Sequence, residues 1–87
     1  MPARFALVMT PAARRDFKRL PADIQRRIDA QILPLTDTPF PNGSEKLEGL
    51  EGLYRIRVGD YRVLYLVDTK QHVVTIAKLR HRREVYR

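Results

Sequence analysis

Apolar side chains recur at every second position in several stretches of the chain, which is the period of a β-strand. The first stretch covers residues 4–9, and both of its faces are rather apolar. We therefore expect a strand there that is buried and central in its sheet. Three further strands are expected later in the chain, over residues 53–58, 61–68 and 73–79.

Between the first and second of these strands, apolar residues are spaced by three or four positions, which is typical of helices. Thr10 is expected to be the N-cap of a helix and Pro11 its first residue. Pro21 marks a tight corner after this helix, and Pro34 is expected to end or kink the next one. Residues 37–44, with two prolines and an Asn-Gly pair, are expected to form a loop. The two apolar stripes are Ala13, Phe17, Leu20 and Ile24, and then Ile24, Ile28, Ile32 and Leu35.

The expected element order is therefore β-α-α-β-β-β. A helical hairpin packed on one face of a twisted, mostly antiparallel sheet buries both stripes and gives a two-layer α+β fold. The chain has 87 residues and no repeat or linker, so a single domain over residues 1–87 is expected. No element remains to cover the second face of the sheet, so that face is expected to be solvated or used.

The two-residue turn at Gly59-Asp60 fixes the register of the hairpin around it. This register places Arg57 directly opposite Arg62, and strand alternation puts Arg55 on the same face. Like charges opposite each other in a sheet are unfavourable. Because the arrangement costs stability without structural gain, we interpret these arginines as a functional cluster. The alternative is an ordinary solvated face, on which the arginines pair with Asp60, Asp68 or Glu84.

Positive charge is concentrated in the C-terminal part of the chain, whose net charge is +7 overall. Residues 1–52 carry eight Lys or Arg and seven Asp or Glu, whereas residues 53–87 carry nine and three. Three acids cannot neutralise nine bases. We therefore interpret this part as a surface for nucleic-acid phosphate, in preference to a basic surface that serves only solubility.

The last ten residues, 78–87, combine basic and aromatic side chains. Arginine pairs with phosphate and an aromatic ring stacks on a nucleobase, which suits Tyr86 to nucleic acid. The alternative for Tyr86 is packing against the edge of a small core. The tail also holds Arg80, His81, Arg82 and Arg83.

We expect no metal and no cofactor. The chain has no cysteine, its two histidines are isolated from carboxylates, and no Asp/Glu cluster has ligand spacing. No signal peptide and no transmembrane span are expected either. These expectations predict a cytoplasmic protein without a membrane partner.

With these residues in place, the sequence resembles the RelE/ParE superfamily of bacterial toxins from type II toxin–antitoxin systems, on the RelE side. The resemblance covers nearly the whole chain, and its central segment is the most specific. The segments that carry it are residues 10–17 with Leu20-Pro21, residues 46–50 (KLEGL), residues 53–65 (LYRIRVGDYRVLY) and residues 81–86 (HRREVY).

The resemblance implies a microbial RNase-like fold and an mRNA interferase, an endoribonuclease that cuts messages in the ribosomal A site and inhibits translation. It also implies a cognate antitoxin protein that wraps the toxin and neutralises it. Operator DNA would be contacted only through the toxin–antitoxin complex.

The resemblance also assigns residues by position. Arg62 and Tyr86 match a family arginine after the turn and a tyrosine near the carboxyl end, and Arg80 or Arg82 matches a late arginine. Relatives often have lysines where Arg55 and Arg57 stand; arginine cannot lose its proton, so these two can bind phosphate but cannot act as bases. Many relatives also have a small residue where Arg80 stands. The residues expected to bind RNA phosphate are Lys46, Arg55, Arg57, Arg80 and Arg83.

The expected reaction is attack of a ribose 2′-OH on the adjacent phosphate, which gives a 2′,3′-cyclic phosphate and a 5′-OH without a metal. Arg62 is the first choice for stabilising the transition state, and Arg82 supports it. The proton is moved either by His81, with an ordinary pKa of about 6.5, or by Tyr86, at about 10, and the sequence does not choose between them.

Two other functions fit the same sequence. A ParE-like toxin would share the fold but poison DNA gyrase and cut no RNA, although the tail ending in Tyr86 favours the RelE type. A non-catalytic module would bind nucleic acid only as the partner of an antitoxin.

Overall fold

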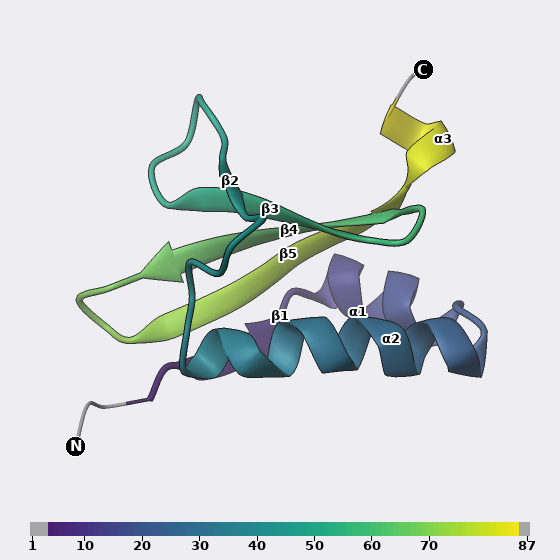
Figure 1. The fold of residues 1–87 in the computed structure, drawn as a ribbon, viewed down its shortest axis with the longest axis horizontal. Helices are drawn as coiled ribbons and strands as arrows, with labels where there is room; N and C mark the ends of the chain where they lie inside the picture. The colour runs from purple at the N-terminus through teal and green to yellow at the C-terminus, as the bar shows by residue number, and fades with distance from the viewer. Residues whose placement is uncertain (1–3, 86–87) are drawn as a thin grey trace.

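The computed structural model describes the backbone of residues 4–85 and the side chains of residues 4–83. Two helices pack on one face of a mixed five-stranded sheet (Figure 1). The elements in chain order are β1 (Ala6–Met9), α1 (Pro11–Lys18), α2 (Ala22–Ile32), the 3-10 helix η1 (Leu33–Thr36), β2 (Glu45–Lys46), β3 (Leu53–Val58), β4 (Tyr61–Asp68), β5 (Val73–His81) and α3 (Arg82–Val85). The expected α+β architecture is confirmed.

The sheet has the order β1-β5-β4-β3-β2, in which β1 runs parallel to β5 and the other neighbours are antiparallel. The prediction that the first strand is central was wrong, because β1 pairs with β5 alone and forms an edge. Leu7 and Met9 pack against the core, whereas Val8, on the other face, is 45% exposed. The apolar run of β1 therefore reflects a strand with one buried face rather than two.

The helical layer begins as the sequence predicts. The Thr10 hydroxyl oxygen accepts a hydrogen bond from the Ala13 N–H at 3.1 Å, and Pro11 occupies the first turn. α2 ends at Ile32, and Pro34 lies inside η1 directly after it. The core between helices and sheet is formed by Ala13, Ile28, Ile32 and Leu35 from the helical layer and by alternate residues of β3, β4 and β5.

Three features of the sheet were not predicted. β2 lies in the stretch before β3, two residues long and opposite Tyr54 and Arg55. β5 extends to His81 and continues directly into α3. β5 also contains a bulge: Leu64 pairs with Lys78 and Tyr65 with Ile76, which leaves Ala77 without a partner on β4.

The bulge changes which side chains of β5 face the helices. Val74 and Ile76 are buried before it, and Leu79 is buried after it. If β5 alternated regularly from Ile76 onward, with no bulge, Lys78 and Arg80 would face the core. The Thr10 hydroxyl donates a hydrogen bond to the Ala77 carbonyl at 2.7 Å, so the cap of α1 also holds the bulge.

Candidate functional site

Three arginines lie side by side across the face of the sheet that carries no helix. Arg57 of β3 is directly opposite Arg62 of β4, and Arg62 is directly opposite Arg80 of β5. Their neighbours Ile56 and Val63 are buried in the core on the other face. The predicted pairing of Arg57 with Arg62 is thus confirmed, and Arg80 extends the row to a third strand.

The turn beside this row is held by α3. Gly59 has a φ of 59°, a left-handed conformation that glycine adopts without strain. The Asp60 carbonyl accepts a hydrogen bond of 2.7 Å from the Arg82 N–H. This contact brings the first residue of α3 against the β3–β4 turn, so Arg82 joins the arginines of the sheet.

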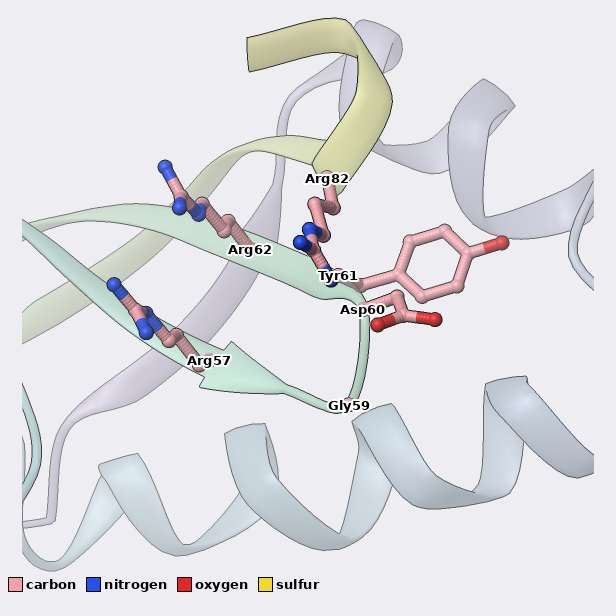
Figure 2. A pocket seen from close by; sticks show the side chains of 6 residues that line it. All are labelled: Arg57, Gly59, Asp60, Tyr61, Arg62 and Arg82. Carbon is pink, nitrogen blue, oxygen red and sulfur yellow. The ribbon is translucent and has the colours of Figure 1, made fainter. Parts of the chain in front are cut away.

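These residues enclose a hollow of about 320 Å³, which we call the arginine hollow. The guanidinium groups of Arg57, Arg62 and Arg82 lie toward one side of the turn, whereas the Asp60 carboxylate points toward the other (Figure 2). Three guanidinium groups can donate many charge-assisted hydrogen bonds to one phosphate. The residues that line the hollow are Arg57, Gly59, Asp60, Tyr61, Arg62 and Arg82.

Arg55, on the same face, has an acidic partner. Its guanidinium is ion-paired with Glu45, directly opposite on β2. Within the described part of the chain, neither Asp60 nor Asp68 is ion-paired with Arg55 or Arg57. The Asp68 carboxylate instead accepts hydrogen bonds from the backbone N–H groups of two turn residues, Lys70 and Gln71. The positive charge of Arg55 is therefore partly neutralised, by a residue that sequence reasoning did not consider.

His81 lies at the end of β5 beside Tyr61, with the two rings edge to face and 5.0 Å between centroids. Its Nδ1 accepts a hydrogen bond of 3.2 Å from the Arg83 N–H. In the neutral imidazole the proton then sits on Nε2, which can donate but not accept. This arrangement suits His81 to donating a hydrogen bond better than to taking a proton. The other candidate, Tyr86, lies outside the described residues.

The other residues that the sequence predicts to bind phosphate do not line the arginine hollow. Lys46 is exposed and opposite Tyr54, whose ring packs against the core, so it belongs to the face that the helices cover. Arg83 is exposed on α3 and does not line the hollow. Lys78, by contrast, was not selected from the sequence but lies in one row with Arg55 and Leu64. The bulge at Ala77 puts it there, and no residue pattern signals that bulge.

No group of three or more His, Cys, Asp or Glu side chains that could hold a metal ion occurs in the portion of the chain that the structure describes. No helix among the described residues is long and apolar enough to cross a membrane.

The chain is similar in sequence to bacterial toxins. Residues 7–86 match the family described as the ParE toxin of the type II toxin–antitoxin system parDE. The chain is 36% identical to Toxin RelE of Mycobacterium tuberculosis over 84 residues, which cover 95% of this chain and 87% of that protein. It is 31% identical to Toxin RelG of the same organism over 84 residues, with coverages of 95% and 97%.

Solved structures show the same fold. A RelE–RelB complex from the archaeon Pyrococcus horikoshii matches with a TM-score of 0.82 at 33% identity, over 91% of this chain and 96% of that chain. The RelBE2 toxin–antitoxin complex of Mycobacterium tuberculosis matches with a TM-score of 0.77 at 29% identity, over 92% and 100% of the two chains.

Proposed function

Because this chain belongs to the RelE/ParE superfamily of type II toxin–antitoxin toxins, we propose that it is a RelE-type mRNA interferase. In this proposal it cuts messenger RNA on the ribosome in the cytoplasm and so inhibits translation. A cognate antitoxin neutralises it, and operator DNA is bound only through the complex of the two. The observation that carries the proposal is the arginine hollow, which Arg57, Arg62 and Arg82 line together.

The chemistry of the hollow supports cleavage by the RNA's own 2′-OH. As that oxygen attacks the adjacent phosphorus, negative charge grows on the phosphate oxygens while the 5′-oxygen leaves. Fixed guanidinium groups around the phosphate stabilise this charge more than that of the ground state. Arginine remains protonated throughout, so these groups contribute charge and hydrogen bonds only.

Arg62 is placed to be the central cation. It lies on β4, which is paired on both sides, between Arg57 and Arg80. A residue on a central strand is held more firmly than one on a loop or a short terminal helix. We therefore assign Arg62 to the transition state, Arg57 and Arg82 to binding of the same phosphate, and Arg80 to an adjoining position.

For proton transfer, the hydrogen bond at the Nδ1 atom of His81 favours a division of roles. His81 would donate a hydrogen bond, without giving up its proton, from Nε2 to the leaving 5′-oxygen or to a phosphate oxygen, and water would protonate the 5′-oxygen. The base that removes the 2′-OH proton would then be Tyr86, among the two candidates.

In vitro translation with mapped mRNA ends tests the proposal. Wild-type protein should cut the message at defined positions when ribosomes are present. Intact message would contradict the assignment. The match to the ParE family keeps DNA gyrase as the alternative target, and an assay of gyrase supercoiling with the same protein would detect it.

Arg55 and Arg57 provide a matched pair for mutation, since they lie two positions apart on one face of β3. Arg57→Ala should slow cleavage on the order of 10²-fold, because it removes a cation of the arginine hollow. Arg55→Ala should change the rate only a few-fold, because Arg55 is ion-paired with Glu45 and lies outside that hollow. Single-turnover cleavage on programmed ribosomes measures both. Equal losses would show that the ion pair of Arg55 opens on RNA binding and that the distinction is wrong.

A further inference from the structure

We propose that Arg27, on helix α2, binds a second RNA phosphate next to the one that is cut. The RNA would then pass from the arginine hollow around the end of β3 to the helical layer. This inference rests on the proposed function and adds a binding subsite to it.

The first observation is the contact between Arg27 and the β3–β4 turn. A Cβ atom placed on Gly59 would lie 3.0 Å from Nη2 and 3.3 Å from Nη1 of Arg27. The guanidinium of a residue from the helical layer thus reaches the turn that borders the arginine hollow. A larger residue at position 59 would require this guanidinium to shift by a few tenths of an ångström.

The second observation is that two hollows meet at this turn. Beside the arginine hollow lies another, of about 270 Å³, which we call the α2 hollow. Both are bordered by Arg57 and Gly59. The α2 hollow is lined by Arg27, Ala30, Gln31, Arg57, Val58 and Gly59.

The edge of β3 is open along this path. β2 begins only at Glu45, opposite Arg55, so residues 56–58 have no neighbouring strand on that side among the described elements. In a two-residue hairpin the two residues that flank the turn form backbone hydrogen bonds with each other. The backbone N–H and C=O of Val58 therefore point toward β4. Alternation then directs the backbone N–H of Arg57 toward the open edge, where it adds a donor to the α2 hollow.

The groups in the α2 hollow suit a sugar–phosphate backbone better than a peptide side chain. Arg27 and Gln31 are four residues apart on one face of α2 and are both exposed. Arg27 has no ion pair with any residue in the described range. A large apolar anchor is lacking, since Val58 is buried in the core and the rest of the lining is two arginines, an amide, an alanine and a glycine. An acidic segment of a protein partner is therefore the less favoured occupant.

Arg26 provides the control for Arg27, because it is adjacent, exposed and equally charged but does not line either hollow. Arg27→Gln and Arg26→Gln reduce the net charge by the same amount. A general electrostatic effect on RNA would therefore change both variants alike. Thermal unfolding of the two variants checks that the turn is intact.

The test neutralises the RNA phosphates one at a time. Messages carrying a single methylphosphonate near the cleavage site are placed on ribosomes, and single-turnover cleavage is measured with wild type, Arg27→Gln and Arg26→Gln. We expect the cleavage rates of wild type and Arg26→Gln to fall about tenfold when the phosphate adjacent to the cut is neutralised. Arg27→Gln should be about tenfold slower on normal RNA and lose little more at that position.

Each outcome has a definite meaning. If wild type cuts RNA and Arg27→Gln responds to every methylphosphonate as wild type does, the subsite does not exist. If Arg27→Gln cleaves normally but binds the antitoxin more weakly, the α2 hollow holds an acidic peptide instead and the inference is overturned. If wild type does not cut RNA at all, the proposed function itself is wrong.

Discussion

Arg62→Ala is expected to lower the rate of mRNA cleavage by on the order of 10²–10³-fold, with little change in the amount of folded protein. Arg62 lies between Arg57 and Arg80 on the central strand β4 and lines the arginine hollow. Its removal takes away the cation that is best fixed relative to the phosphate. Single-turnover cleavage on programmed ribosomes measures the loss.

Two further variants make the Arg62 result specific. Arg62→Lys keeps the positive charge but loses the planar fork of donors, so it should restore only part of the rate. Arg14→Ala, which removes an exposed arginine on α1, should leave cleavage close to wild type. Undiminished cleavage by Arg62→Ala would exclude the arginine hollow as the site of reaction.

Tyr65→Ala is expected to reduce the free energy of unfolding by about 3–5 kcal/mol. Tyr65 is fully buried on β4, and its hydroxyl donates a hydrogen bond of 2.9 Å to the Pro39 carbonyl. Its ring also stacks with Tyr54, with 5.9 Å between centroids. Domains of this size have a stability at the low end of roughly 5–15 kcal/mol, so most of it would be lost. Urea unfolding followed by circular dichroism measures the change.

Removing only the hydroxyl of Tyr65 separates the contribution of its hydrogen bond from that of its ring. Tyr65→Phe keeps the ring and should cost only about 1 kcal/mol, from the lost hydrogen bond to the Pro39 carbonyl. Leu64→Ala, next to it but on the partly exposed face, should cost less than Tyr65→Ala. If Tyr65→Ala were no more harmful than Leu64→Ala, the core would not depend on this residue.

The burial of Tyr65 should also affect how the stability of the fold depends on alkaline pH. Burial raises the pKa of Tyr65 above its usual value, because the charged phenolate is poorly solvated there. The unfolded chain therefore ionises first. The contribution of Tyr65 is complete below about pH 10, the unfolded pKa, and is lost as pH rises through the folded pKa. Tyr65→Phe should have a weaker loss of stability above pH 10 than wild type.

The part of the arginine site that could be predicted from the sequence is the part that depends on local geometry. The two-residue turn at Gly59-Asp60 sets the pairing of Arg57 with Arg62, because hairpin register follows from turn length. The cap at Thr10 and the helix stop at Pro34 are local in the same sense. Each depends on residues that are neighbours in the sequence.

The rest of the site depends on contacts between distant segments. The bulge at Ala77, which turns Lys78 and Arg80 to the open face, is held partly by Thr10 from the other end of the chain. Arg55 is neutralised by Glu45 across a strand pairing that has no alternating pattern. Arg27 reaches the Gly59 turn only because α2 packs on the sheet. Periodicity within one segment cannot predict such contacts.

The open face of the sheet was expected to be either solvated or functional, and its charges now make the second interpretation more specific. One end holds the arginine row, and the other holds Leu53, Leu66 and Thr75 in a cross-strand row. Arg55 and Lys78 lie in the row between these two, so the cations occupy the arginine row and the row next to it rather than the whole face. This concentration is what a single scissile phosphate requires, whereas a basic surface serving only solubility has no need of it.

The chemical identity of the RNA ends at the cut tests the proposed function most directly. Ribosomes programmed with a defined message are incubated with the wild-type protein, and the two ends are analysed by mass spectrometry. Attack by the 2′-OH predicts a 2′,3′-cyclic phosphate on one fragment and a 5′-OH on the other. Intact message, or a 3′-OH paired with a 5′-phosphate, would contradict the account.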